Sequence, residues 1–203
     1  AHALLMSSRT RIEQEPNYSF VAARLLLDSL RKEALSFLGH VRSEATQAEM
    51  AERYADYFAE YIKQGAELEL LSTELTRYDL KRLGAALKPE RDLNFNYLGL
   101  QTLYDRYLII DKVSKPSRRI ETPQFFWMRV SMGLFLDEKT GREDWAIRLY
   151  ELYKSRRFCS STPTLFNSGT LHSQLSSCYL YYVDDTIESI MLRGIADNAF
   201  LAK

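Results

Sequence analysis

The sequence predicts a mainly α fold, in which a helical N-terminal region is followed by short strands and one more helix. Apolar residues repeat with the period of a helix through most of the first 155 positions. Glycine occurs 8 times and proline 5 times in 203 residues, too few for the many turns of an all-β fold. Beyond position 158 the pattern changes to short runs of β-forming residues bounded by turn residues.

The first half of the chain predicts three helices. Apolar side chains fall on one face from Tyr18 to Leu38, which indicates the first helix. A second periodic run begins near Ser43, and Gly65 is placed as its C-cap. A shorter third helix is predicted over Thr73 to Leu83, closed by Gly84.

The middle of the chain is less regular. The aromatic-rich run 93–108 indicates a short helix with a loop before it. Residues 107–111 and 119–120 flank a basic, turn-rich segment, which is typical of a small hairpin or of a solvated surface turn.

Two further helices precede the change of pattern. Thr122 and Pro123 are typical of an N-cap and a first helical position, and a mostly apolar run follows them. Thr140 and Glu143 have the spacing of a capping box, which predicts a helix carrying Trp145.

The last part of the chain predicts two strands and a helix. Phe158–Ser161 and Gln174–Val183 are rich in β-forming residues, and a loop of about a dozen residues separates them, a length that is often functional. Asp185 is placed to cap the following helix, with Glu188 completing a capping box. That helix is expected to run to Lys203.

The composition is that of a folded protein with balanced charge. Hydrophobic residues make up 46% of the chain, and 27 basic residues face 27 acidic ones, which disfavours a dedicated nucleic-acid binder. No window approaches the roughly 18 apolar residues of a membrane span, and 2 cysteines are too few for a secreted disulfide framework. The 3 histidines lack metal-ligand spacing. We expect a cytoplasmic protein with no metal, nucleic-acid or membrane partner. A start at Ala1 without methionine indicates a segment of a longer protein.

Cys178 is the strongest candidate for chemistry. It lies between Ser177 and Tyr179 on a predicted strand, where a thiol facing a cleft could act in redox or radical reactions. From these residues alone, a small buried hydrophobic side chain is the favoured interpretation. Cys159 is a weaker candidate of the same kind.

Two segments could hold an anion. The hydroxyls and backbone N–H groups of Ser161–Gly169 are suited to a phosphate, although such a composition is more often an ordinary turn. The junction Asp184–Ile187 opens a predicted helix, where phosphates bind, although an aspartate there more often caps the helix.

Taken together, several segments resemble the ribonucleotide reductase large (α) subunit family. Phe158–Thr170 (FCSSTPTLFNSGT), Gln174–Leu180 (QLSSCYL) and Asp185–Ile190 (DTIESI) are similar to the start of that family's ten-stranded α/β catalytic barrel. Upstream, Glu121–Gly133 (ETPQFFWMRVSMG) is similar to the family's helical domain, and Phe20–Lys32 to the tail of its ATP cone. The order of the segments is that of the family.

The resemblance implies three regions and an enzymatic activity. The regions are an ATP-cone-like tail (1–40), a helical domain (41–157) and the start of the barrel (158–203). The implied enzyme is a class I ribonucleoside-diphosphate reductase, an allosteric oxidoreductase that supplies deoxyribonucleotides for DNA replication.

The resemblance also implies roles for particular residues. Cys178 matches one cysteine of the redox-active disulfide that reduces the ribose 2′ carbon, and Thr164 and Ser177 match positions that line the substrate site. Asp185, Thr186 and Ile187 match the specificity site for a deoxynucleoside triphosphate or ATP, and Lys32 matches a phosphate-contacting lysine of an ATP cone.

The implied partners lie outside this chain. They are a ribonucleoside diphosphate, nucleotide effectors, a second α subunit, thioredoxin or glutaredoxin, and a small metal-containing β subunit that supplies the radical. The family's radical cysteine and the partner of Cys178 match nothing in this chain, so the chain alone is expected to be inactive and to carry no cofactor. Two alternatives remain: a non-catalytic helical interaction or regulatory module, and a related radical enzyme that uses cobalamin or a glycyl radical.

Overall fold

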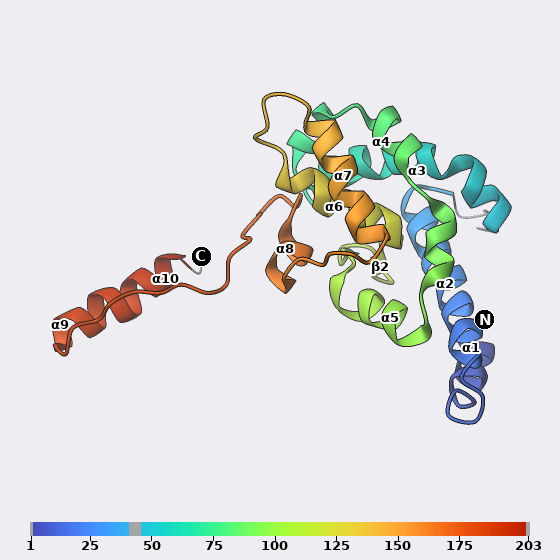
Figure 1. Ribbon diagram of the computed structural model, residues 1–203, viewed down its shortest axis with the longest axis horizontal. Helices are drawn as coiled ribbons and strands as arrows, with labels where there is room; N and C mark the ends of the chain where they lie inside the picture. Colours follow the sequence, from blue (N-terminus) through green and yellow to red (C-terminus); the bar gives the residue numbers. More distant parts are fainter. Residues whose placement is uncertain (1, 41–45, 202–203) are drawn as a thin grey trace.

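A helical body and one projecting arm make up the chain (Figure 1). The computed structural model describes residues 2–40 and 46–201. The body is formed by the elements up to α8, and the arm carries α9, η4 and α10 away from it. None of the described helices is both long and apolar enough to span a bilayer.

The elements of the body follow one another with short connections. They are α1 (His2–Arg9), α2 (Tyr18–Phe37), α3 (Gln47–Glu67), η1 (Thr73–Arg77), α4 (Leu80–Ala86), η2 (Pro89–Asn94), α5 (Tyr97–Thr102), η3 (Leu103–Tyr107), β1 (Ile110–Asp111), β2 (Arg118–Arg119), α6 (Pro123–Leu134), α7 (Arg142–Lys154) and α8 (Thr162–Asn167). The arm contains α9 (Ile187–Ser189), η4 (Ile190–Asp197) and α10 (Asn198–Leu201), which form one continuous helical segment.

Helix α6 lies at the centre of the body, as the burial of its side chains on all sides shows. Phe125 and Met128 join a core cluster with α3, α4 and α7. Phe126 and Val130 point into a second cluster with α2, α5 and the end of α7. A helix that is apolar all round is typical of such an interior position.

A buried ion pair ties α2 to the middle of the body. Arg31 and Asp92 lie 2.9 Å apart with almost no exposed side-chain surface. Asp92 also accepts hydrogen bonds from the Tyr54 hydroxyl at 3.0 Å and from the Gln124 amide at 3.0 Å. Burial raises the pKa of Asp92, and Arg31 with these donors opposes that shift.

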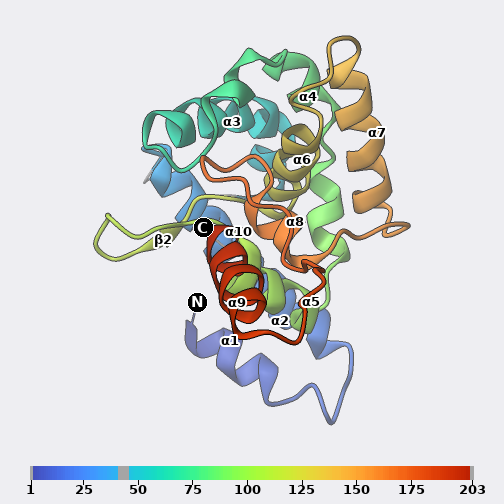
Figure 2. The ribbon, with the colours of Figure 1, turned by 90° about the vertical axis from the view of Figure 1, so that its left-hand side faces the viewer.

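Several predicted elements are confirmed. The first helix begins at Tyr18 as expected and ends one residue earlier, at Phe37. The hairpin exists: Ile110 pairs with Arg119 in antiparallel register, and it projects from the body (Figure 2). Thr122 and Pro123 occupy the predicted N-cap and first helical positions of α6, although the Thr122 hydroxyl bonds to the Tyr54 hydroxyl at 2.6 Å and makes no capping hydrogen bond.

The predicted helix ends at two glycines were wrong. Gly65 lies inside α3, where an added Cβ would stand 2.6 Å from Leu71 Cδ1. Gly84 lies inside α4 against the backbone of Ala55, and the predicted third helix is divided into η1 and α4. Both glycines permit a close approach between elements and do not cap a helix. The predicted start near Ser43 lies outside the described residues.

The predicted capping box was also wrong. The N-cap of α7 is Gly141, whose φ of 66° lies in the left-handed region. The Glu143 carboxylate instead accepts a hydrogen bond from the backbone N–H of Asp79 at 3.3 Å. Glu143 therefore joins α7 to Asp79, the N-cap residue of α4.

The two predicted strands are not formed in the described chain. Residues 158–161 are irregular, the loop after them contains α8, and residues 174–183 are extended without a paired neighbour. Leu71 and Thr170 form an isolated antiparallel bridge. A strand requires a hydrogen-bonding neighbour, and no described segment provides one here.

The helix of the arm begins differently from the prediction. Its N-cap is Thr186, whose Oγ1 accepts a hydrogen bond from the Ser189 N–H at 3.2 Å, so the expected cap by Asp185 was wrong. The segment remains helical through Leu201, and its predicted end at Lys203 lies outside the described residues.

Candidate functional site

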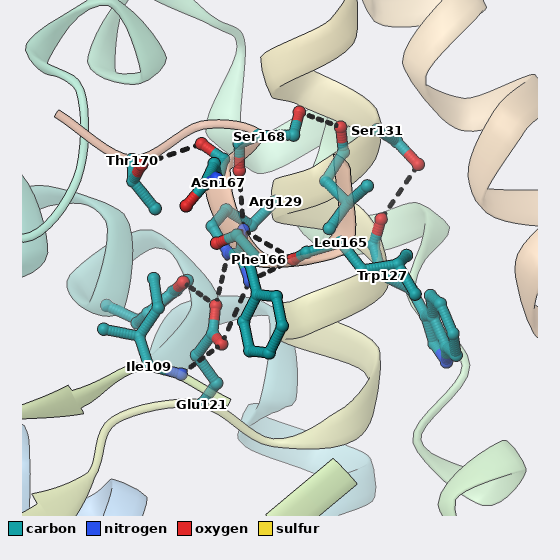
Figure 3. Close-up of polar contacts among 12 residues, drawn as sticks. Ile109, Glu121, Trp127, Arg129, Ser131, Leu165, Phe166, Asn167, Ser168 and Thr170 are labelled. Carbon is teal, nitrogen blue, oxygen red and sulfur yellow. Dashed lines mark hydrogen bonds and ion pairs between the residues drawn. The ribbon is translucent and has the colours of Figure 1, made fainter. Parts of the chain in front are cut away.

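A buried ion pair forms the centre of the candidate site (Figure 3). Arg129 Nε lies 2.6 Å from Glu121 Oε1, and neither side chain has any exposed surface. Glu121 also accepts a hydrogen bond from the Tyr61 hydroxyl at 2.5 Å and from the Ile109 N–H at 2.9 Å. The carboxylate is thus satisfied by groups from α6, from α3 and from the segment before β1, and a buried charge requires such partners.

The protonation states in this cluster follow from its surroundings. Burial would lower the pKa of Arg129, but Glu121 and Tyr61 raise it on balance, so the guanidinium stays charged. Burial, together with the Glu121 carboxylate, raises the pKa of Tyr61 well above its ordinary value. The Tyr61 hydroxyl therefore remains a hydrogen-bond donor throughout the physiological pH range.

Arg129 connects this cluster to the turn that follows α8. Its Nη1 donates to the carbonyl oxygen of Ser168 at 2.6 Å, and Nη1 and Nη2 each lie 3.4 Å from the carbonyl oxygen of Leu165. The Ser168 hydroxyl donates to the carbonyl oxygen of Val130 at 2.8 Å. Because the last carbonyl groups of a helix lack partners within the helix, a guanidinium is well suited to hold them.

Two glycines allow the turn to lie directly on α6. A Cβ at Gly133 would stand 2.1 Å from the nitrogen of Gly169, and a Cβ at Gly169 would stand 3.0 Å from Arg129. Gly169 has φ of 77°, a backbone conformation that favours glycine. Its carbonyl accepts a hydrogen bond from the Ser72 N–H at 3.0 Å, so the turn is fixed from both sides.

Thr164 lies in α8, the short helix that this turn follows. Its side chain is half-buried, and its Oγ1 is 3.4 Å from Ser161 Oγ. Its carbonyl accepts a hydrogen bond from the Ser168 N–H at 3.0 Å. The exposed Thr162 hydroxyl lies 3.2 Å from the Tyr107 hydroxyl. These contacts place hydroxyl groups on the solvent side of the anchored turn.

Ser177 and Cys178 lie together in the extended part of the arm. Both are exposed, Cys178 is a free thiol, and its Sγ is 3.8 Å from Ser177 Oγ. The thiol is therefore not the buried hydrophobic side chain that residue type alone favoured. Cys159 is also a free, exposed cysteine.

Asp185, Thr186 and Ile187 lie at the start of the helix of the arm. All three are exposed, and Ile187 retains 82% of its surface. The Thr186 N–H donates to the carbonyl oxygen of Asp184 at 2.8 Å, so the junction is a tight turn. Ser189 Oγ accepts a hydrogen bond from the Asp184 N–H at 3.0 Å.

Lys32 lies on an exposed part of α2. Its ammonium group forms an i,i+4 ion pair with Asp28 at 2.9 Å, and about half of its side chain (51%) is exposed. Such a pair stabilises a helix by only a few tenths of a kcal/mol, about 0.3–0.5. The charge is therefore accessible to a second anion.

The structure brings some of these residues together and leaves others apart. Ser177 lies beside Cys178, but no hydrogen bond within residues 2–40 and 46–201 joins either one to Thr164. The link between the two segments is Asn167, whose amide donates to the carbonyl oxygen of Gln174 at 2.6 Å. No trio of His, Cys, Asp and Glu side chains in the described chain is arranged to hold a metal ion.

Sequence reasoning missed the anchoring residues Glu121 and Arg129. A signal for them exists: each is a charged residue within a stretch that otherwise predicts burial. A buried charge is almost always paired, so the two opposite charges could have been matched to each other.

Comparisons with known proteins show a family profile that matches part of the chain and relatives that match most of it. The profile of the ribonucleotide reductase all-alpha domain matches residues 93–173. Over 201 residues, 99% of this chain, the sequence is 47% identical to the ribonucleoside-diphosphate reductase subunit alpha of Chlamydia muridarum. It is 38% identical over 175 residues to that of Helicobacter pylori and 31% identical over 190 residues to that of Enterobacteria phage T4. The chain spans 18%, 20% and 24% of these relatives, respectively.

Proposed function

Because this chain belongs to the ribonucleotide reductase α-subunit family over the region that it spans, we propose that it serves in a ribonucleoside-diphosphate reductase. In this proposal the helical body supports the entrance to a catalytic domain, and the enzyme converts ribonucleoside diphosphates to deoxyribonucleoside diphosphates. The same matches favour this function over a non-catalytic interaction module, because the relatives are named as reductase subunits.

One observation carries the proposed chemistry: Cys178 is a free, exposed thiol within the sequence that aligns with the reductase α subunit of Chlamydia muridarum. Reduction of a ribose 2′ carbon replaces C–OH by C–H and releases water. Two thiols supply the two electrons and are oxidised to one disulfide, so the reaction balances. We assign Cys178 as one of these thiols, and a second cysteine of the enzyme as the other.

We assign Thr164, on α8, and Ser177, next to Cys178, to the proposed substrate site. Hydroxyl groups suit a diphosphate or ribose because each can donate and accept a hydrogen bond. Arg129 is a positioning residue in this proposal, since it holds the turn after Thr164 without facing solvent. The extended segment 174–183 would form the first strands of an α/β barrel once neighbouring strands pair with it.

The proposed regulation uses the start of the arm helix and α2. Asp185, Thr186 and Ile187 are assigned to a specificity site for a nucleoside triphosphate, and their exposure is compatible with ligand contact. Lys32 is assigned to an ATP-cone remnant. The apolar side of the arm helix would then pack against a second α subunit, because Ile190, Met191 and Ile195 remain exposed.

The remaining proposed partners complete the cycle. A small metal-containing β subunit would supply the radical, and thioredoxin or glutaredoxin would reduce the disulfide after each turnover. These assignments fit a cytoplasmic enzyme of deoxyribonucleotide synthesis.

The test is the replacement Cys178→Ser in the full-length enzyme, assayed with its β subunit and a dithiol reductant. We expect loss of deoxyribonucleotide formation, because a hydroxyl cannot form the disulfide. Ser176→Ala, two residues away on the same exposed segment, is the matched control and should retain activity. Turnover by C178S close to that of the wild type would defeat the assignment.

A further inference from the structure

A cavity of about 510 Å³ lies where α2, α5, α6 and the end of α7 meet. Five of its eleven lining residues are aromatic, namely Phe20, Phe95, Trp127, Tyr153 and Phe158. Trp127 and Tyr153 are stacked, with ring centroids 5.0 Å apart and an interplanar angle of 19°. This pair supports the two rings of the lining that stay exposed, Phe20 (43%) and Phe158 (48%), and exposed aromatic faces are suited to stacking of a nucleobase.

A second cavity of about 630 Å³ adjoins the first, since Phe20, Asn94 and Arg156 line both. Its walls are basic: the lining contains Arg24, Arg91, Lys154 and Arg156 and no acidic residue. The first cavity, with its aromatic rings, is called the aromatic chamber below, and it lies directly next to the second, cationic cavity.

The guanidinium groups at this junction are available to an anion. Arg24 donates to the carbonyl oxygen of Phe20 at 3.1 Å, and Arg156 donates to that of Asn94. Within the described part of the chain neither they nor Arg157, which lines the first cavity, form an ion pair with a carboxylate. Lys154 differs, because Glu151 lies 2.5 Å from its ammonium group.

We propose that this double cavity binds a nucleoside polyphosphate. The base stacks on the aromatic chamber, and the phosphates contact Arg24, Arg156 and Arg157, whose planar forks match phosphate oxygens. The site shares no residue with the positions assigned above to substrate or effectors. It therefore does not depend on the proposed function.

The shape of the site favours a nucleotide over an acidic peptide. The aromatic chamber falls in the range of about 300–1,000 Å³ that is typical of small-ligand sites. Arg24, Arg91 and Lys154 line only the adjoining cavity, and Arg156 lines both, as expected for a ligand with one aromatic end and one anionic end. A peptide rich in carboxylates would use the arginines and leave the stacked rings unused.

Cys159 provides a local reporter because it lines the aromatic chamber and is exposed. The full-length protein is alkylated with iodoacetamide, and the rate at Cys159 is followed by peptide mass spectrometry. We expect ATP to slow this reaction, and to do so at lower concentration than adenosine or pyrophosphate, because only ATP fills both chambers. The reading is local to one thiol, and variants of the lining residues distinguish direct protection from an effect transmitted from another nucleotide site.

Two variants test the contacts with the two ends of the ligand, one with the phosphates and one with the base. Arg157→Ala should raise the half-protecting ATP concentration by about tenfold, which is roughly the worth of one charge-assisted hydrogen bond. Phe158→Ala should weaken protection by ATP and adenosine and leave that by pyrophosphate unchanged. Arg148→Ala and Phe200→Ala, exposed residues outside the lining, are the matched controls and should behave as the wild type. Circular dichroism confirms that each variant is folded.

Four results would overturn the proposal. They are the absence of any ATP protection, equal protection by pyrophosphate and ATP, stronger protection by a polyglutamate peptide than by ATP, and failure of Cys159 to react in the folded, ligand-free protein. The last result would mean that another part of the full-length protein covers the cavity. None of them bears on the role of Cys178, so the two proposals fail separately.

Discussion

At the scale of single residues, Arg129 is a side chain on α6 that joins two parts of the body by hydrogen bonds. It neutralises Glu121 and holds the carbonyl groups of Leu165 and Ser168. A buried ion pair adds little net stability, but removal of one partner leaves an uncompensated charge. The main role of the pair is therefore to hold the turn after α8 in one position, and its net contribution to stability is small.

Replacement of Arg129 tests this role. Arg129→Met should lower the free energy of unfolding by about 3–5 kcal/mol, because Glu121 is left buried and unpaired. The measurement is urea denaturation, with Arg148→Met as the exposed control, which should stay within about 0.5 kcal/mol of the wild type. In the double variant Glu121→Gln, Arg129→Met the loss should be smaller than in R129M alone; an equal or larger loss would contradict the argument.

Asp111 gives the chain a pH-dependent contact at the hairpin. Its carboxylate accepts hydrogen bonds from the Ser114 hydroxyl and from the N–H groups of Val113 and Ser114. The Ser114 hydroxyl bond is the largest cause of a lowered pKa, and Arg118 contributes to it. A carboxyl group with a lowered folded-state pKa stabilises the fold above its unfolded value of about 4, and this contribution is lost as the pH falls through the folded value.

We therefore expect Asp111→Asn to destabilise the protein more at pH 7 than at pH 3. Urea unfolding of wild type and variant at both pH values measures this difference. Asp137→Asn, an exposed carboxyl group on the loop after α6, shows the effect of removing a negative charge alone. An equal loss for D111N at both pH values would show that its hydrogen bonds do not depend on ionisation.

At the scale of elements, the contact between α6 and the turn after α8 depends on the absence of a side chain. Gly133→Ala should destabilise the protein by about 1–3 kcal/mol or more, since the new Cβ would collide with the backbone of Gly169. Gly194→Ala is the matched control in the arm, because nothing lies within 4 Å of its Cβ position. Thermal unfolding should show a lower midpoint for G133A only; an unchanged midpoint would mean that the turn can move away freely.

The sequence predicted the elements better than their ends. The periodic apolar faces of α2 and α6 depend on local spacing alone, and both helices were found. Gly65 and Gly84 resemble helix-ending glycines in sequence, but tertiary packing against Leu71 and Ala55 explains them. Glu143 likewise contacts Asp79, a residue far away in the sequence.

The candidate site was predictable only in part. Cys178 was predicted because a thiol between polar residues is conspicuous, and the structure places it as a free, exposed cysteine. Arg129 was not found because its hydrogen-bond partners come from two separate parts of the chain, Glu121 before α6 and residues 165–168 at the end of α8. The predicted strand 174–183 requires hydrogen-bonding neighbours that its own sequence cannot supply.

At the scale of the whole molecule, exposed apolar surface is concentrated in the arm. Leu180, Tyr182, Ile187 and Phe200 each retain 75% or more of their surface. The extended segment contacts its own helix, through Tyr181 to Asn198 and through Gln174 to the carbonyl of Leu201, but the arm stands away from the body (Figure 1). A segment with few buried contacts opens more easily than a packed core.

Limited proteolysis should therefore cut the arm first. We expect the first chymotrypsin cleavages of this 203-residue chain between residues 179 and 182, where three tyrosines and a leucine are consecutive. Mass spectrometry of early time points identifies the sites. A first cut within α3 or α6, which are rich in aromatic residues but buried, would contradict the described arrangement.

The isolated bridge between Leu71 and Thr170 and the hydrogen bond between Asn167 and Gln174 lie where the chain leaves the packed body. Every partner of the Arg129 side chain has been synthesised by residue 168. On a ribosome, the helical body can thus reach its final packing while later residues are still being added. It would then present residues 174–183 as a ready template on which following strands could assemble one after another.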